Sequence, residues 1–201
     1  KTCEEECAIA QKLIRDNPSL YSNIRNVGDP VNDRSGETSE FAPYYENGEL
    51  YFSRLQYQDA KQETKALRIF KHKGQDRGTN RAINTNDQNA YLAISSDGQR
   101  LYEINCPDLN KKFGDRNCKI YSREKTGENQ WSDRKILPSH INLSNTNNTQ
   151  PAIGMDKEGN DILYFVSNRA GGKGGMDIWM SIIKKDDNGK ITYAEPFNLE
   201  N

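Results

Sequence analysis

The fold is indicated most clearly by the sequence Ala90-Tyr91-Leu92-Ala93-Ile94-Ser95-Ser96-Asp97-Gly98-Gln99-Arg100-Leu101-Tyr102. Two apolar runs lie on either side of an Asp-Gly pair, and this pattern predicts two strands joined by a tight turn. The Asp-Gly pair suits a type I′ turn, whose two central residues both need a positive φ. The stretch is therefore interpreted as a β-hairpin.

The same hairpin pattern occurs three times. The other two copies cover residues 40–52, with Asn47-Gly48 at the turn, and residues 150–165, with Glu158-Gly159. A third apolar run follows each hairpin, at residues 67–70, 119–121 and 177–180. A fourth is visible in two copies, at residues 131–137 and 193–199. Each unit also begins with an aliphatic residue and an asparagine, namely Val31-Asn32, Ile83-Asn84 and Ile141-Asn142.

Repeated units of four short strands and about 50 residues predict an all-β fold, specifically a β-propeller. The expected blades are residues 29–82, 83–140 and 141–201. Residues 1–28 are expected to form a linker and a short N-terminal helix over 4–15, which Pro18 ends. Because propellers close with about four to eight blades, the three blades are expected to be part of a larger propeller.

The charge and hydropathy of the chain limit the class of partner. Lys and Arg total 28 against 29 Asp and Glu, a formal net charge of −1. This balance does not predict a nucleic-acid partner. No apolar run is long enough for a transmembrane helix.

The four cysteines indicate a disulfide and an oxidising compartment. Alignment of the second unit on the third places Cys106 at the end of the second strand and Cys118 just before the third strand. On adjacent antiparallel strands these two residues are within disulfide range, so a Cys106–Cys118 bond is expected. The state of Cys3 and Cys7 stays open, and their spacing does not indicate a zinc site.

The third unit closely resembles the TolB-like (WD40-like) propeller repeat. The resemblance rests on Gln150-Pro151-Ala152-Ile153 and on the run from Leu163 through Gly171-Gly172-Lys173-Gly174-Gly175 to Trp179. It is strongest to the version in Bacteroidetes envelope proteins that also carry an OmpA-like domain. The resemblance implies a periplasmic or outer-membrane-associated protein, in some members a part of type IX secretion. It also implies protein partners, such as outer-membrane proteins or a peptidoglycan-associated complex.

The motifs that could indicate chemistry are better interpreted as turns. In the glycine cluster a Gly follows Lys173, where a phosphate-binding loop needs Ser or Thr, so a hairpin loop is expected there, with Asp177 or Arg169 bonding its backbone. The carboxylates of residues 156–161 and 186–188 match no calcium loop and are assigned to hairpin turns. The two histidines offer little basis for a nucleophile–base pair.

From these observations we expect a non-catalytic propeller scaffold that binds a protein or an envelope polymer. No catalytic, cofactor-binding or metal-binding residue is assigned, and no partner-binding residue is identified. The alternative is a glycan-binding or glycan-hydrolysing propeller, because abundant carboxylates leave a glycosidase pair open.

Overall fold

The computed structural model describes residues 11–12, 15–16, 27–28, 31–32, 38–46, 48–57, 65–72, 78–79, 83–84, 88–107, 116–128 and 130–199. The N-terminal helix expected over 4–15 lies almost entirely outside the described residues, of which residues 11–12 and 15–16 are helical. The other elements of the described chain are β-strands. They form three antiparallel sheets.

Each sheet is built from consecutive strands, so the repeat seen in the sequence corresponds to a repeat in space. The first sheet holds β1 (Ser39–Glu46), β2 (Glu49–Tyr57), β3 (Lys65–His72) and β4 (Gly78–Thr79). The second holds β5 (Asn89–Ile94), β6 (Arg100–Asn105), β7 (Lys119–Gly127), β8 (Gln130–Trp131) and β9 (Lys135–Ile136). The third holds β10 (Asn148–Met155), β11 (Asp161–Ser167), β12 (Asp177–Lys185), β13 (Ile191–Tyr193) and β14 (Phe197–Asn198).

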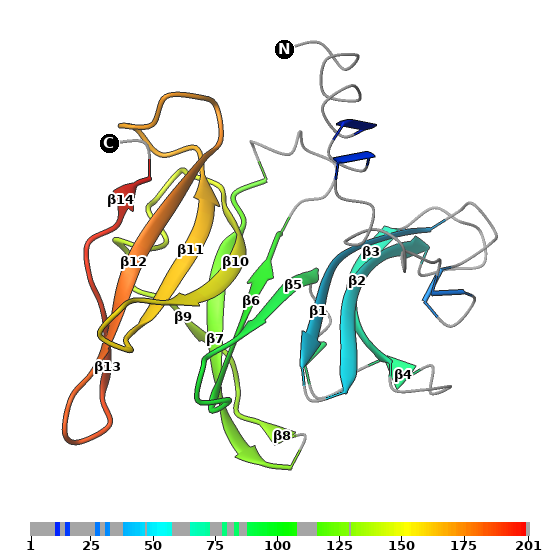
Figure 1. Ribbon diagram of the computed structural model, residues 1–201, viewed down its shortest axis with the longest axis horizontal. Coiled ribbons are helices and arrows are strands. Elements are labelled where there is room, and N and C mark those ends of the chain that lie inside the picture. The colour runs from blue at the N-terminus through cyan, green and yellow to red at the C-terminus, as the bar shows by residue number, and fades with distance from the viewer. Residues whose placement is uncertain are drawn as a thin grey trace.

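The sheets lie side by side in chain order, and the first strands β1, β5 and β10 are neighbours in the middle of the molecule (Figure 1). In the second and the third sheet, two short strands stand in place of the single expected fourth strand. β8 and β9 both pair with β7, and β13 and β14 both pair with β12. The first sheet has a short fourth strand, β4, that the sequence pattern did not reveal. The all-β arrangement of three antiparallel sheets is confirmed.

The first strand of every sheet carries a β-bulge at the same place. The pairing register shifts between Phe41 and Tyr44, between Ala90 and Ala93, and between Thr149 and Ala152. The residue after the first of each pair has a positive φ, at Ala42 (51°), Tyr91 (51°) and Gln150 (52°). This conformation is uncommon for residues other than glycine, and its recurrence shows that the three units share one backbone design.

The asparagine that opens the second and the third unit joins that unit to the preceding sheet. Asn84 accepts the Ile69 amide at 2.8 Å and donates to the Ile69 carbonyl at 2.6 Å. Asn142 makes the same two bonds with Ile120, at 2.8 Å and 2.7 Å. One side-chain amide thus satisfies both backbone groups of a buried residue.

In each sheet a buried or half-buried arginine donates a hydrogen bond to the backbone carbonyl of the aliphatic residue that precedes the asparagine. Arg54 donates to the carbonyl of Val31, and Arg123 donates to the carbonyl of Ile83. Arg169 donates to the carbonyl of Ile141, packs against Phe165 and Trp179, and has a pKa that burial lowers to about 10. The repeated aliphatic–asparagine pair is therefore part of the joint between sheets.

The hairpin turns differ from the expected type I′. At the second and third hairpins Gly98 (φ 69°) and Gly159 (φ 84°) have a positive φ, but the preceding Asp97 and Glu158 do not. In each turn a carboxylate accepts backbone N–H groups instead, as Asp97 does from Gln99 at 2.9 Å and Asp156 from Asn160 at 2.7 Å. Because these carboxylate hydrogen bonds stabilise the turn, the residue before the glycine does not need a positive φ.

The disulfide between Cys106 and Cys118 is confirmed, with a Cα–Cα distance of 4.2 Å. Both cysteines are buried in the core cluster, which extends over all three sheets and includes Leu67 of the first. The disulfide supports an extracytoplasmic location, since such bonds persist in oxidising compartments. None of the described helical residues forms a segment long and apolar enough to cross a membrane.

Candidate functional site: a polar pocket between the second and third sheets

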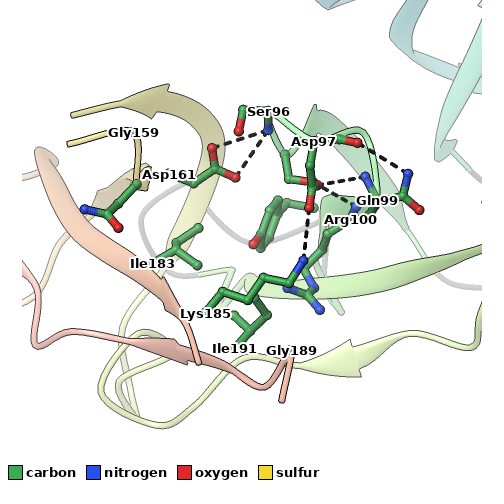
Figure 2. Close-up of a pocket in the computed structure, with 13 residues that line it drawn as sticks. Ser96, Asp97, Gln99, Arg100, Gly159, Asp161, Ile183, Lys185, Gly189 and Ile191 are labelled. Atoms are coloured by element: carbon green, nitrogen blue, oxygen red, sulfur yellow. Dashed lines mark hydrogen bonds and ion pairs between the residues drawn. The ribbon is translucent and has the colours of Figure 1, made fainter. Parts of the chain in front are cut away.

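A cavity of about 300 Å³ lies between the second and third sheets. Figure 2 shows it in close-up, with the β5–β6 turn and Asp161 on one side and the end of β12 on the other. Three loops or strand ends from two sheets therefore converge on one space. A concave site with a few convergent polar groups is where a ligand is expected to bind.

The β5–β6 turn presents Asp97 to the pocket in a fixed geometry. The Ser95 hydroxyl donates to the Asp97 carboxylate at 2.7 Å, and the Gln99 amide donates to the same oxygen at 2.9 Å. Lys185, from the end of β12, reaches toward Asp97 with an N–O distance of 3.6 Å (Figure 2). The turn that ends the β5 strand thus also supplies an oriented carboxylate.

These contacts set the charge state of Asp97. Partial burial alone would raise the pKa of this carboxyl group. The hydrogen bonds from Ser95 and Gln99 and the charge of Lys185 outweigh burial, and the pKa of Asp97 lies below its usual value. Asp97 is therefore ionised throughout the physiological pH range.

A second carboxylate, Asp161, comes from the start of β11 in the third sheet. Its two oxygens accept the Ser96 amide of the β5–β6 turn at 3.3 Å and 3.2 Å (Figure 2). This bond links the sheets and holds Asp161 beside the turn. Asn160, the residue before it, adds an amide group to the lining of the pocket.

The remaining wall of the pocket is apolar. It consists of Ile183, Ile191 and the ring of Tyr102. Burial raises the pKa of Tyr102, whose hydroxyl accepts a hydrogen bond from Tyr193 at 3.3 Å. The pocket therefore combines carboxylates, amides and cations with an apolar surface.

A second cavity, of about 400 Å³, opens where the bulges of β1, β5 and β10 meet. Tyr44, Tyr91 and Ile153 are among its lining residues, and its described lining contains no charged side chain. It has fewer groups that could orient a polar ligand than the pocket between the sheets. The polar pocket is therefore the stronger candidate.

The other motifs singled out from the sequence lie outside this pocket. The amide of Gly174 donates to Asp177 at 3.0 Å, which confirms the loop-bonding role expected of Asp177. Arg169 does not serve that loop, because it bonds His140, Ile141, Asn148 and Ser167. Asp156 and Asp186 each accept backbone amides within their own turns, as hairpin turns require.

The sequence did not indicate the pocket residues as a site, because the turn in which each lies is enough to explain its residue type. Asp97 was assigned to a turn, and Asp161 was one of several carboxylates near a turn. Only the packing of the sheets brings them together. In the described part of the chain, no three His, Cys, Asp or Glu side chains come together in a way that could hold a metal ion.

Comparison with known proteins returns only distant similarities. No model of a known protein family matches the chain. No curated protein matches it either.

Similar solved structures include a thermostable family-43 glycoside hydrolase, at 14% identity, a TM-score of 0.48 and coverage of 77% of this chain and 53% of that one. An endo-1,4-beta-xylanase from Bacteroides thetaiotaomicron follows at 11% identity, a TM-score of 0.43 and coverage of 85% and 62%. A Trypanosoma rangeli sialidase is similar at 12% identity, a TM-score of 0.41 and coverage of 78% and 30%. The chain thus spans less than two thirds of the length of each.

These comparisons correct three expectations. The TolB-like (WD40-like) resemblance was wrong, because no family model matches and the similar structures named here are glycosidases. The type IX secretion context rested on that resemblance and is withdrawn with it. The scaffold without catalytic activity was also the wrong reading, since these neighbours are enzymes. Envelope protein partners stay a prediction that the comparisons do not address.

Proposed function

We propose that this chain recognises carbohydrate and that a saccharide unit binds in the polar pocket between the second and third sheets. A sugar ring has hydroxyl groups around its edge and C–H groups on its faces. The pocket offers the matching surfaces, with Asp97 and Asp161 as acceptors for hydroxyl groups and Ile183 and Ile191 as an apolar wall. This pairing of surfaces is the observation that carries the proposal.

The volume and charge of the pocket also support a neutral sugar. At about 300 Å³ the cavity is at the small end of ligand pockets, which favours one ring over a long chain. Asp97 is paired with Lys185, and Arg100 is paired with Glu124 at 3.3 Å. Because the charges are balanced within the site, a neutral polar ligand is favoured over an ion.

The experiment is a screen of immobilised glycans, followed by calorimetric titration of the best ligand. Asp97→Asn and Asp161→Asn keep the shape and the acceptor oxygen but remove the charge, and each is expected to weaken binding by about tenfold or more. Asp187→Asn is the matched control, because Asp187 is an exposed residue of the β12–β13 hairpin that does not line the pocket. Binding that is unchanged in both pocket variants would contradict the proposal.

A second candidate function is hydrolysis of the bound glycoside. The observation that favours it is the presence of two carboxylates on one pocket, since glycosidases generally use a pair of Asp or Glu residues. Asp97, with its lowered pKa, is suited to the role of the ionised carboxylate. Release of reducing ends from the identified glycan tests it, and a loss of release in Asp97→Asn that persists at saturating glycan, where weaker binding cannot explain it, would support this role.

The three sheets are proposed to be blades of a propeller with further blades, in an extracytoplasmic protein. The support is the shared bulge at Ala42, Tyr91 and Gln150 and the repeated asparagine joint. Small-angle scattering of the protein would test whether its shape fits a section of a ring or a closed ring.

A further inference from the structure

The two oxygens of the Asp97 carboxylate have different surroundings in the polar pocket. Oδ1 accepts the Ser95 hydroxyl at 2.7 Å and the Gln99 amide at 2.9 Å, and these two bonds fix the carboxylate within its own turn. Oδ2 faces Lys185, whose Nζ lies 3.6 Å away on the other side of the cavity (Figure 2). Asp97 therefore presents one particular oxygen, Oδ2, to the space beside Lys185.

The β12–β13 hairpin holds Lys185 in place from the third sheet. Lys185 pairs with Ile191 in the strand ladder, and both residues line the pocket. The turn that follows is closed by Asp186, whose carboxylate accepts two backbone amides of the same turn at 3.0 Å and 2.8 Å. The Lys185 side chain passes close to Gly189, where an added Cβ would lie 3.9 Å from the Lys185 Cε. The backbone that carries Lys185 is thus fixed without a ligand.

Lys185 and Asp97 lie close together without a short direct bond. A charge-assisted hydrogen bond between an ammonium and a carboxylate is about 2.7–2.9 Å long, and their distance of 3.6 Å exceeds this. The two side chains are 58% and 47% exposed, and an ion pair this exposed adds little to the stability of a protein. The ammonium group and Oδ2 are therefore accessible to a ligand group that lies between them.

A group in that position must accept from the ammonium and donate to the carboxylate. A hydroxyl group has one donor and two acceptor lone pairs, so it can do both, whereas an ionised carboxylate or an ether oxygen has no proton to donate. We propose that Lys185 determines specificity, because one saccharide hydroxyl accepts from Lys185 and donates to Oδ2 of Asp97. This inference rests on the proposed carbohydrate recognition and narrows the ligand to saccharides in which that hydroxyl is free.

The test compares a sugar with its monodeoxy derivatives by calorimetric titration. Methyl glycosides of glucose, galactose, mannose and xylose are titrated first, and the monodeoxy derivatives of the best ligand follow. One derivative is expected to bind the wild type about tenfold or more weakly than the parent sugar. Lys185→Met keeps the length of the side chain and removes the charge, so it is expected to reduce this ratio by about threefold or more and to leave the ratios of the other derivatives unchanged. Asp97→Asn is expected to reduce the ratio of the same derivative.

Two further variants serve as controls. Lys184→Met is expected to change no ratio, because Lys184 is exposed and does not line the pocket. Lys185→Arg keeps a charged donor and is expected to retain part of the discrimination. Circular dichroism melts show whether each variant is folded.

The outcomes separate this inference from the proposed function. Binding with ratios that Lys185→Met leaves unchanged would overturn the role of Lys185 and leave carbohydrate recognition standing. Tighter binding by Lys185→Met would also overturn it, because Lys185 would then compete with the ligand for Asp97. So would Lys185→Met and Asp97→Asn acting on different derivatives. If none of the glycosides and none of the screened glycans binds, the proposed function fails together with this inference.

Discussion

The side chain of Asn142 bonds both backbone polar groups of Ile120, accepting its amide at 2.8 Å and donating to its carbonyl at 2.7 Å. Ile120 is fully buried in the third strand of the preceding sheet, where water cannot replace the lost partner. This one residue therefore joins two sheets through two otherwise unsatisfied groups.

Asn142→Ala is expected to lower the free energy of unfolding by on the order of 2–6 kcal/mol, because two buried backbone groups lose their partner at 1–3 kcal/mol each. Asn142→Asp keeps the acceptor but places a buried carboxylate against the carbonyls of Ile120 and Leu137, so its cost is expected to be at least as large. Urea unfolding measures both. Asn188→Ala, on an exposed turn, is the control and is expected to change stability by less than about 0.5 kcal/mol. An equal effect of Asn142→Ala and Asn188→Ala would show that the joint contributes nothing.

Glu103 and Arg123 form a buried ion pair at 2.7 Å inside the second sheet. Asn89 also donates to the Glu103 carboxylate, at 3.1 Å, and burial raises the pKa of Glu103. Glu103→Gln is expected to cost about 3–5 kcal/mol, because it leaves the Arg123 charge uncompensated in the core.

A double-mutant cycle with Arg123→Met separates the pair from the packing of each side chain. The double variant is expected to be destabilised by less than the sum of the single variants, since it leaves no unpaired charge. If the changes in the free energy of unfolding of the two single variants add up to that of the double variant, the two side chains do not interact.

The Cys106–Cys118 disulfide closes the segment of residues 107–117, which connects β6 to β7. Its loss in a Cys106→Ala/Cys118→Ala variant is expected to cost on the order of 3 kcal/mol, because the unfolded chain regains the freedom of that loop. Alkylation and mass spectrometry without reductant are expected to find both thiols blocked. Reductant is expected to lower the melting temperature of the wild type and to have a much smaller effect on the double variant. Free thiols at both positions in the native protein would refute the bond.

The pKa of Asp97 reports on the pocket directly. Lys185→Ala removes a positive charge 3.6 Å from the carboxylate, so the pKa of Asp97 is expected to rise, because the ionised form loses a favourable interaction. Lys184→Ala is the control, because Lys184 is exposed and precedes the pocket-lining residue by one position. Titration of the side-chain carboxyl carbon by NMR measures both. An unchanged pKa in Lys185→Ala would place Lys185 away from Asp97 in solution.

The repeat could be predicted from the sequence because hairpins depend on local turn chemistry. Gly98 and the strand residues on either side are sufficient to locate a turn, and the spacing of the units indicates separate sheets. Cys106 and Cys118 could be paired because the repeat aligns them on neighbouring strands. The positive φ of Tyr91 could not be predicted from the sequence, since tyrosine is an ordinary strand residue. The TolB-like resemblance failed because strand and turn residues are shared by many families of β-sheet repeats.

The pocket could not be predicted, because it depends on contacts between units. Ser96 and Asp161 are 65 positions apart, and nothing in the local sequence of either indicates the bond between them. The repeated aliphatic–asparagine pair could be recognised in the sequence. Its role in joining the sheets could not, because that role depends on the hydrogen bonds between the Asn84 side chain and the backbone of Ile69.

Saccharide binding between the second and third sheets is tested most directly by the change in amide NMR shifts of the protein on titration with the glycan that the binding screen selects. The largest changes are expected at Ser96, Gln99, Asn160 and Asp161, and Asp161→Asn is expected to reduce them at equal ligand concentration. Changes centred instead on Ala42, Tyr91 and Gln150, or no saturable changes with any glycan that the screen offers, would contradict it.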